Sequence, residues 1–240
     1  MMSKLLYVLD LIGMSLSQFR LKFLNKQLLK ENKEYIYERS IEYGFVLDIL
    51  SESKSLKVLD CGTGSNSFGA TLQHCGYLVT ATDFKSGSYW SFFENRHIPV
   101  VDDDITNSKI KANSYDAAIC ISTIEHIPDY VNAFKGLCNA VKPGGIIIVT
   151  CPYTHNEYYN NVYKHPDSDK LSDNFKYIAQ SFSDMEVNGF VNNNPVSILK
   201  RIYFKGWEGK FWRTGNRIDF PIKVDNKEEA NGICLAFRKQ

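Results

Sequence analysis

Apolar and polar residues follow one pattern in the first part of the chain and another in the rest. In the first part, apolar residues recur at helical intervals, for example at Leu5, Leu9 and Ile12, and such spacing is typical of amphipathic helices. Further along, short apolar runs alternate with helical stretches, and no linker rich in proline, glycine or serine separates the two parts. The pattern predicts an N-terminal helical cap over residues 1–54 and a main domain over residues 55–240.

The main domain is expected to alternate strands with helices. Several short apolar runs fit strands, and the last of them is rich in the β-branched residues typical of a buried parallel strand. Strands that alternate with helices in this way form a doubly wound parallel sheet. The expected strands span residues 57–60, 77–83, 98–101, 115–121 and 146–151, and helices are expected over residues 68–75 and 130–141.

The C-terminal third has a different pattern. A helix is expected over residues 175–185, and strands are expected over residues 197–204 and 232–238. A turn-rich connection lies between these two strands, so we expect them to pair antiparallel at one edge of the sheet. The predicted fold class is therefore α/β: a doubly wound sheet, mostly parallel, with an antiparallel C-terminal strand and an N-terminal helical cap.

Composition and charge argue against several classes of protein. Of the 240 residues, 44% are hydrophobic, which is enough for a sizeable core. The formal net charge of +1 gives no broad field that would attract nucleic acid, so no nucleic-acid partner is expected. The 6 cysteines contain no CxxC pair and are expected to be buried thiols in a reducing compartment.

The sequence contains no candidate membrane span, because no run of 18 apolar residues exists. The apolar run after Lys4 resembles a signal peptide, but Asp10 interrupts it and no small-residue cleavage site follows. We therefore expect this segment to be an amphipathic helix and the protein to be cytoplasmic.

The most informative segment is the loop after the first expected strand of the main domain. It contains Asp60, Gly62 and Gly64 and precedes a helix, and glycine there lets the backbone turn tightly and approach a ligand. The next strand ends in Asp83, where an acid can accept both hydroxyls of a ribose. A dinucleotide-binding loop would have glycine at the place of Ser67, and the acid at Asp60 suits a cationic amino-acid group better than a phosphate.

Five segments of the chain together resemble the class I methyltransferases that depend on S-adenosyl-L-methionine (SAM). The resemblance is clearest over residues 56–151 and continues more faintly to the C-terminus. It implies a Rossmann-like fold, with SAM as methyl donor and S-adenosyl-L-homocysteine (SAH) as product. The segments are VLDCGTGSN, VTATDF, VVDDDIT, YDAAICISTIEHI and VKPGGIIIVTCPY.

The resemblance implies that the first loop lies along the methionine part of SAM. Its candidate contacts are Asp60, Gly62 and Gly64, with Thr63 between the two glycines. The family commonly has a third glycine where this chain has Asn66. Asparagine tolerates a left-handed backbone better than most residues, so altered detail near the SAM carboxylate is expected, without loss of binding.

The resemblance also implies contacts to the adenosine part of SAM. Asp83 is expected to bind the ribose, with Phe84 beside the adenine. An acid after the third strand usually meets the adenine amino group in this family. Asp104 followed by Ile105 fits that place best, and Asp103 is the alternative if the alignment slips by one residue.

The loop after the fourth expected strand is the first candidate for chemistry. It begins with Ser122, a further candidate for cofactor binding, and it contains Glu125 and His126, which resemble a Glu-His pair common in small-molecule members of the family. His126 has a side chain that titrates near neutral pH, so it can take a proton from an acceptor hydroxyl. A supporting role for this histidine is the alternative.

The loop after the fifth expected strand is the second candidate, since it is dense in aromatic and polar side chains that suit a substrate wall. Tyr153 and His155 are its candidates for contact with an acceptor hydroxyl. No metal site is expected, because the histidines and acids lack metal-ligand spacing. The aromatic and basic stretch at residues 203–213 offers a further place that could bind an anionic or sugar-like acceptor.

The leading interpretation is O-methylation of a small polar acceptor, either hydroxylated or phosphorylated. Residues 92–97 and the loop at 155–159 resemble bacterial methyltransferases associated with surface-polysaccharide biosynthesis, which makes a capsular or surface-polysaccharide precursor an example. The alternatives are a SAM-binding regulatory or scaffold module and a nucleic-acid base methyltransferase. A NAD-dependent oxidoreductase is less favoured because of Ser67. The expected partner is the small-molecule acceptor, and a homodimer is left open.

Overall fold

The computed structural model describes residues 37–51, 56–85, 95, 97–168 and 177–240. The chain divides into two compact units, Met1–Glu38 and Arg39–Gln240, and the second contains nearly all of the described residues. Most of the expected N-terminal cap therefore lies outside the described residues, as does most of the 92–97 stretch.

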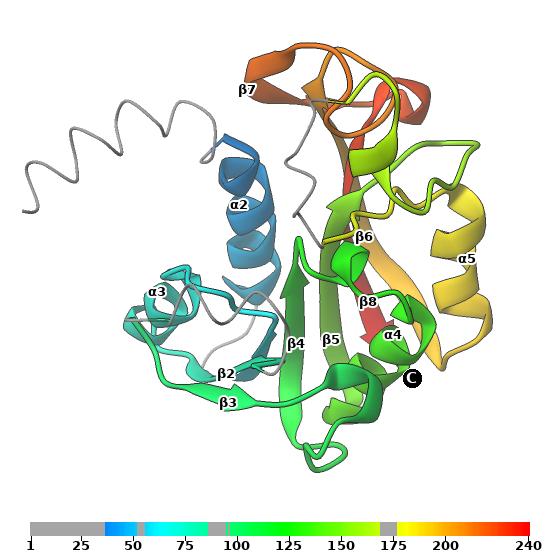
Figure 1. Ribbon diagram of the computed structural model, residues 1–240. Coiled ribbons are helices and arrows are strands. Elements are labelled where there is room, and N and C mark those ends of the chain that lie inside the picture. Colours follow the sequence, from blue (N-terminus) through cyan, green and yellow to red (C-terminus); the bar gives the residue numbers. More distant parts are fainter. Residues whose placement is uncertain (1–36, 52–55, 86–94, 96, 169–176) are drawn as a thin grey trace, which may run out of the picture. The chain divides into compact units, whose positions relative to one another are not determined.

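The described residues of the second unit form an eight-stranded sheet in the order β3-β2-β1-β4-β5-β8-β6-β7 (Figure 1). The first five strands run parallel. β8 is antiparallel to both of its neighbours, and β7 is antiparallel to β6. The strands are β1 (Lys57–Cys61), β2 (Leu78–Asp83), β3 (Val100–Asp102), β4 (Tyr115–Ile121), β5 (Val141–Pro152), β6 (Val196–Trp207), β7 (Arg217–Val224) and β8 (Gly232–Lys239).

Helices cover both faces of this sheet. The α-helices α2 and α3 pack on one face and α4 and α5 on the other (Figure 1). The 3-10 turns η1 to η4 are short and connect these elements. The bounds are α2 (Tyr37–Ser51), α3 (Phe68–His74), α4 (Tyr130–Ala140), α5 (Asp184–Asn192), η1 (Ile105–Asn107), η2 (Ile124–His126), η3 (Val162–Lys164) and η4 (Lys227–Glu229).

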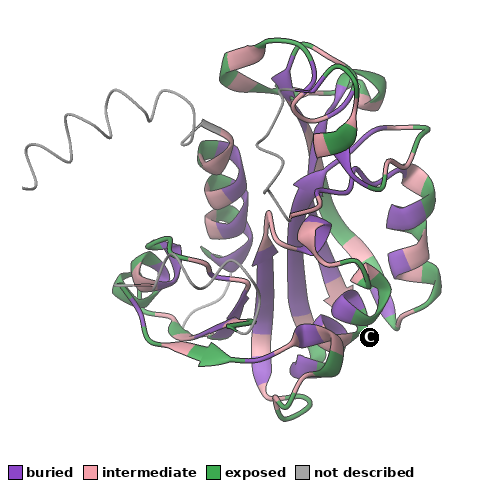
Figure 2. Cartoon of the chain, in the orientation of Figure 1, coloured by how far each residue is buried: buried purple, intermediate pink, exposed green. Residues whose placement is uncertain are grey.

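The two faces have separate apolar cores because successive strand residues point to opposite sides. In β5, Ile147 packs with the α4 and α5 side, whereas its neighbour Ile148 packs with the α2 and α3 side. Phe134 of α4 stacks on Phe190 of α5 with ring centroids 4.3 Å apart. The central strands are buried on both faces (Figure 2), which explains why their sequences are continuous apolar runs.

The expected α/β fold is confirmed, but the C-terminal third differs from the prediction in two ways. The predicted helix over 175–185 is wrong: the helix begins at Asp184, and the described residues before it form bridges with the 153–159 loop. Ser183 determines this start, because its side chain and that of Glu186 form a capping box.

The second difference concerns the sheet. β6 and β8 do pair antiparallel as expected, but β8 lies inside the sheet between β5 and β6. The connection predicted to be only turns contains β7, which forms the edge. Pro221 within β7 is compatible with this place, since an edge strand does not need every backbone N–H for pairing.

The six cysteines are free thiols, and Cys75 is exposed whereas the others are buried. Burial raises the pKa of Cys138 to about 12 and raises those of Cys151 and Cys234 well above the usual value. Over the described residues, no helix combines the length and apolar character that crossing a membrane requires.

Candidate functional site

The loop between β1 and α3 lies at the carboxyl end of the parallel strands. Gly62 and Gly64 both have positive φ, 72° and 55°. The N–H groups of Gly62 and Thr63 donate to the carbonyl of Thr82 at 2.9 and 3.1 Å, which holds the loop over the end of β2. The strand-loop-helix sequence thus gives a rigid turn at the place where this class of sheet binds ligands.

The two glycines serve different purposes. A Cβ on Gly62 would lie 2.1 Å from a methyl carbon of Thr123, so glycine is required there for packing. A Cβ on Gly64 would meet no atom within 4 Å among the described residues. Gly64 therefore presents bare backbone to open space, as a cofactor-binding loop requires.

Asp60 is buried at the end of β1, with 4% of its surface exposed. Its Oδ2 atom has no hydrogen-bond partner among the described residues, and the same is true of the buried Thr63 hydroxyl. Burial, to which the charge of Asp83 adds, raises the pKa of Asp60 to about 6, although the nearby Thr63 hydroxyl lowers it in part. Oδ2 lies on the α3 side, where a Cβ on Gly69 would be 2.9 Å away, and a buried polar atom without a full hydrogen bond is costly.

Asn66 does not adopt the left-handed conformation that its type allowed, since it is not among the residues with positive φ. Its side chain instead donates to the Thr63 carbonyl and accepts from the N–H of Phe68. The side-chain amide of Asn95 donates to the carbonyls of Gly64 and Asn66, both at 2.9 Å. Side-chain hydrogen bonds thus replace the third glycine of the family's loop.

Asp83 ends β2 beside the same loop. Its carboxylate accepts from the N–H groups of Gly64 and Phe84, each at 2.8 Å and each on a different oxygen. A carboxylate oxygen has two lone pairs, so both oxygens retain acceptor capacity for a diol. The Phe84 ring lies next to it and is half exposed.

The acids after β3 are held in a compact turn. Asp103 is buried, and its two oxygens accept from the Ser108 hydroxyl and the Lys109 N–H at 2.6 and 2.8 Å. Asp104 begins η1 and accepts from both donors of Thr106 through Oδ1. Of the two, Asp104 is the more accessible.

Ile105, the third candidate in this turn, is a core residue, and its carbonyl lies where a Cβ on Gly136 would be 2.0 Å away. The close contact with α4 therefore fixes the position of this turn relative to the end of the sheet. The side chain of Ile105 faces the core on the α4 side, so its backbone is the part that remains for a ligand.

Ser122, which follows β4, has a φ of 44°. Its N–H donates to Thr150 of β5, and its hydroxyl donates to Glu42 of α2 at 2.7 Å. The next residue, Thr123, donates to the Gly62 carbonyl at 3.0 Å. Sequence analysis missed Glu42; the available signal was an acid directly beside the apolar positions of a predicted helix.

His126 lies in η2 and is largely enclosed. Its Nδ1 is 2.6 Å from the carbonyl of Ile178, and since a carbonyl only accepts, Nδ1 carries the proton. Burial lowers the pKa of His126, which favours the neutral ring with its lone pair on Nε2. The neighbouring Glu125 is also buried, and burial, with a contribution from Glu42, raises its pKa to about 8.

Tyr153 and His155 belong to a different cluster. The Tyr153 ring is fully buried, and its hydroxyl donates to Asp184 Oδ1 at 2.6 Å. His155 Nδ1 lies 3.1 Å from Asp184 Oδ2, and Lys227 Nζ lies 2.6 Å from the same oxygen. Burial and the bond to Asp184 raise the pKa of Tyr153. These side chains satisfy one another, which favours a structural role for Tyr153.

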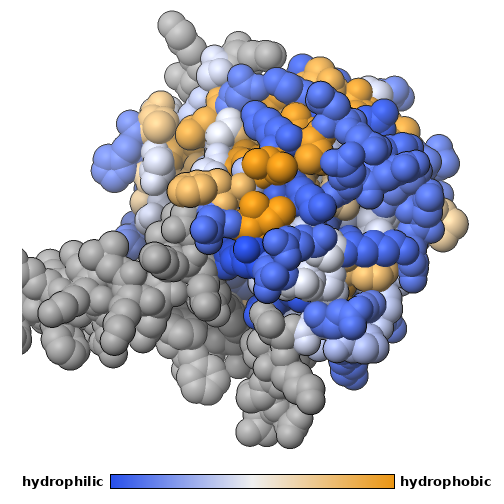
Figure 3. Space-filling view, turned by 90° about the horizontal axis from the view of Figure 1, so that it is seen from above, coloured by the Kyte–Doolittle hydropathy of each residue, from blue (hydrophilic) through white to orange (hydrophobic). Residues whose placement is uncertain are grey.

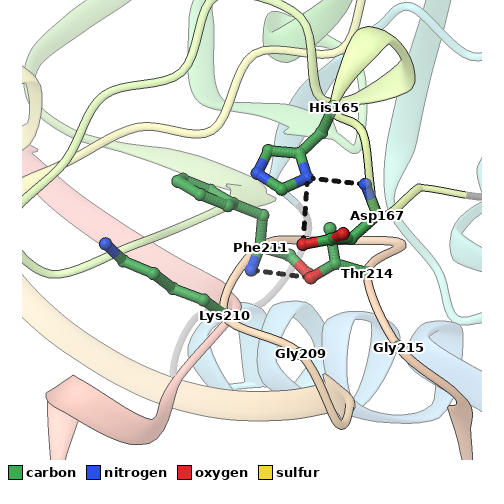
Figure 4. Close-up of a pocket in the computed structure, with 7 residues that line it drawn as sticks. All are labelled: His165, Asp167, Gly209, Lys210, Phe211, Thr214 and Gly215. Atoms are coloured by element: carbon green, nitrogen blue, oxygen red, sulfur yellow. Dashed lines mark hydrogen bonds and ion pairs between the residues drawn. The ribbon is translucent and has the colours of Figure 1, made fainter.

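A cavity of about 360 Å³ lies between the η3 region and the turn from β6 to β7 (Figure 4). His165 Nδ1 accepts from the Asp167 N–H at 3.1 Å, so its Nε2 is the donor in the neutral ring. Lys210 contributes an exposed ammonium group that pairs with Glu157 at 2.5 Å. The lining residues are His165, Asp167, Gly209, Lys210, Phe211, Thr214 and Gly215.

The part of the chain that the structure describes contains no group of three or more His, Cys, Asp or Glu residues arranged to hold a metal ion.

Comparison with known proteins finds a matching family and several relatives. A family model described as a methyltransferase domain matches residues 59–149. The ubiquinone biosynthesis O-methyltransferase of Rickettsia canadensis is 26% identical over 121 residues, which cover 49% of each chain. The chain thus spans about half the length of the curated relatives it matches.

Two solved structures are similar over most of the chain. A SAM-dependent methyltransferase of Thermotoga maritima, described as a possible histamine N-methyltransferase, has a TM-score of 0.58 at 16% identity and covers 89% of this chain and 97% of its own. The 1,6-didemethyltoxoflavin-N1-methyltransferase of Burkholderia thailandensis, solved with SAH, has a TM-score of 0.56 at 13% identity, covering 93% and 86%. The chain therefore has the Rossmann-like fold of SAM-dependent methyltransferases, and its residues 59–149 match the methyltransferase-domain family.

Proposed function

We propose that this chain is a SAM-dependent methyltransferase that modifies an oxygen of a small polar acceptor. The observation that carries the proposal is the β1–α3 loop. It combines the buried carboxylate of Asp60, whose Oδ2 atom has no well-formed hydrogen bond among the described residues, with the open space above Gly64. Asp83, at the end of the next strand, adds a carboxylate that can accept hydroxyls.

These residues fit SAM better than a nicotinamide dinucleotide. SAM carries cationic groups, which an anionic Asp60 attracts, whereas a pyrophosphate beside a buried acid would be repelled. Asp83 would accept the ribose hydroxyls, Phe84 would lie by the adenine, and Asp104 with the backbone of Ile105 would meet the adenine edge. Asp103 has both oxygens occupied within its own turn, so it is the weaker candidate.

When bound, SAM supplies an activated methyl group that is transferred by in-line displacement. The contribution of the chain is first to hold donor and acceptor in line, which can lower the barrier by about 7–11 kcal/mol. The rigid loop between Gly62 and Gly64 and the clamped Ser122 suit this purpose. A general base adds about 10²–10⁴-fold to the rate.

His126 is the candidate base. Its Nδ1 proton is committed to the Ile178 carbonyl, and burial keeps the ring neutral. The Nε2 lone pair can therefore accept the proton of an acceptor hydroxyl as the oxygen–methyl bond forms. His155 is the second candidate, but its Nδ1 already faces Asp184.

The acceptor class is proposed from the chain's own surface and from the relatives. The word O-methyltransferase in the relatives' description supports an oxygen acceptor. Seen from above, apolar surface gathers near the middle of the face, and polar groups lie beside it on the right (Figure 3). Lys210 and His165 provide donors for a hydroxylated or phosphorylated molecule, such as a surface-polysaccharide precursor.

Thermal unfolding with added ligands tests the cofactor. SAM or SAH at a hundred times its dissociation constant should stabilise the protein by about 2.7 kcal/mol, and NAD or NADP should not. Asp83→Ala should lose this response. Asp102→Ala is the matched control: Asp102 pairs with Asp83 in the sheet, and among the described residues its carboxylate accepts from the Lys85 N–H. A response to NAD or NADP alone, or no response to SAM and SAH, contradicts the proposal.

Product formation separates an enzyme from a SAM-binding scaffold. Incubation with methyl-labelled SAM and a panel of sugars, sugar phosphates and phenols should transfer label to an acceptor oxygen. His126→Gln should lower kcat by about 10²–10⁴-fold and leave SAH affinity unchanged. Equal rates in His126→Gln and the wild type would assign His126 a supporting role.

A further inference from the structure

Helix α2 carries a buried acid directly beside its apolar positions. Glu42 is 2% exposed, and its neighbours Ile41 and Phe45 pack into the core on this face of the sheet. A buried carboxylate is unfavourable unless its oxygens are paired and hydrogen-bonded. The partners of Glu42 therefore show what this acid does in the fold.

Each oxygen of Glu42 has strong partners. Oε1 accepts from the hydroxyls of Ser122 and Thr150, both at 2.7 Å. Oε2 forms an ion pair with Arg39 Nη1 at 2.5 Å. The two hydroxyls belong to residues at the carboxyl ends of β4 and β5, so one carboxylate from α2 ties both strand ends together.

Ser122 has a backbone conformation that such a contact can stabilise. Its φ of 44° lies in the left-handed region, which non-glycine residues seldom adopt. Its N–H donates to the carbonyl and the hydroxyl of Thr150 at 3.1 and 3.0 Å, and Glu42 holds its side chain. Strained residues persist where their surroundings over-determine them, and they cluster at functional sites.

The conformation of Ser122 determines where the next residues lie. Thr123 donates to the carbonyl of Gly62 and fills the space that a side chain at Gly62 would need. His126 follows within the same short segment, where the N–H of His126 donates to the carbonyl of Thr123 at 2.9 Å. Ser122 thus connects α2 with both the glycine loop and the candidate base.

We propose that Glu42 is a positioning residue of the methyl-transfer site, which holds Ser122 in its left-handed conformation and so places Thr123 against the cofactor loop and His126 beside the acceptor. This inference rests on the proposed function. Glu42 lies outside the 59–149 segment that matches the methyltransferase domain, so this helix adds a support that the matched segment does not contain.

The test is a double-mutant cycle that measures SAH affinity by calorimetry. Glu42→Ala is expected to raise the Kd of SAH at least tenfold, and Glu42→Gln, whose amide oxygen still accepts hydroxyl protons, should stay within threefold of the wild type. In a Ser122→Gly background, Glu42→Ala should add less than a threefold change, because glycine adopts positive φ without help. Ser122→Ala removes the hydroxyl that donates to Glu42, so its Kd should resemble that of Glu42→Ala.

Asp48→Ala is the control on the same helix: Asp48 is exposed and pairs with Lys200, so its Kd for SAH should equal that of the wild type. Amide hydrogen exchange without ligand supplies a second readout, and exchange over residues 122–126 should accelerate in Glu42→Ala and in Ser122→Ala. The inference is overturned if folded Glu42→Ala binds SAH like the wild type, or if its effect is as large in the Ser122→Gly background. If wild-type protein does not bind SAH, the proposed function itself fails, and faster exchange in the variants still shows that Glu42 holds the loop.

Discussion

Two aspartates in this fold have opposite surroundings. Asp60, at the end of β1, is buried, has an oxygen without a described partner, and has its pKa raised to about 6. Asp184, at the start of α5, accepts from Tyr153 and Lys227 and lies next to His155. Burial opposes the ionisation of Asp184, but the bonds from Lys227 and Tyr153 outweigh it and lower the pKa.

The difference shows how to tell a binding region from a structural one when both are rich in polar residues. Around Asp184 the chain supplies every partner, so the cluster has little left to offer a ligand. Around Asp60 the described residues leave a buried acceptor without a well-formed hydrogen bond, close to a half-buried glycine loop, which costs stability unless a ligand supplies the partner. Unsatisfied buried groups are therefore better evidence for a site here than the density of polar side chains.

The largest expected effect is on the stability of the protein without ligand. Asp60 has a folded-state pKa of about 6 against an ordinary value of 3.8, so folding favours its protonated form, and wild-type stability falls as pH rises from about 3.8 to about 6 and then stays level. Asp60→Asn lacks this loss and should be more stable by about 3 kcal/mol at pH 8. Urea unfolding at pH 4 and pH 8 measures it, and identical pH dependence in the two proteins would contradict the comparison.

Asp184→Asn should have the opposite sign and a smaller size. It weakens charge-assisted hydrogen bonds from Tyr153 and Lys227, and the free energy of unfolding should fall by about 1–2 kcal/mol at pH 7. Because the pKa of Asp184 is lowered on folding, its contribution is present above pH 3.8 and is lost as pH falls through the lowered value. SAH affinity should not change. A large loss of affinity would indicate that the ligand binds beside α5 instead of at the glycine loop.

A third prediction concerns ligand affinity and pH. Since a cationic ligand favours ionised Asp60, SAM affinity should weaken about tenfold between pH 7 and pH 5, which is about 1.4 kcal/mol. Asp60→Asn should bind SAM weakly and without this dependence. Calorimetric titrations at both pH values test it, and a wild-type Kd that is constant over this range would show that Asp60 does not face the ligand's charge.

The smallest expected effect on stability comes from alanine substitutions at two glycines with positive φ, one beside the proposed cofactor site and one in a turn elsewhere. Gly64→Ala and Gly144→Ala each place a Cβ at positive φ, 55° and 77°, with no described atom within 4 Å. Each should lower stability by about 1 kcal/mol. Only Gly64→Ala should also weaken SAH binding, because its new methyl occupies the proposed cofactor space. Equal Kd values for the two variants would place the ligand elsewhere.

Local sequence patterns predicted the central part of the fold well, because parallel strands buried on both faces are continuous apolar runs. The run at Ile146–Val149 is an example, and β5 contains it. The residues before α5 could not be predicted in this way. Bonds from distant residues hold them extended, as in the pairing of Ser181 with Tyr159, and β7 is an exposed edge strand without an apolar run.

The candidate site was predictable where it depends on residues close together in sequence. Asp60, Gly62 and Gly64 share one loop, and Asp83 ends the next strand, so strand-loop-helix spacing was enough to locate them. Glu42 was not predictable, since its role depends on a contact across 80 positions with Ser122. The sequence likewise could not show that the hydroxyl of a buried tyrosine, Tyr153, is occupied by Asp184.

The distribution of the cysteines has a practical consequence for chemical labelling. Cys75 is the exposed thiol among the six, and it follows directly on α3, the helix that leaves the glycine loop. The other five are buried, and burial raises the pKa of Cys151 and of Cys234; a thiol that is not ionised reacts slowly. A maleimide dye should therefore attach at Cys75 in the wild-type protein and report ligand binding at the loop by a change in its fluorescence.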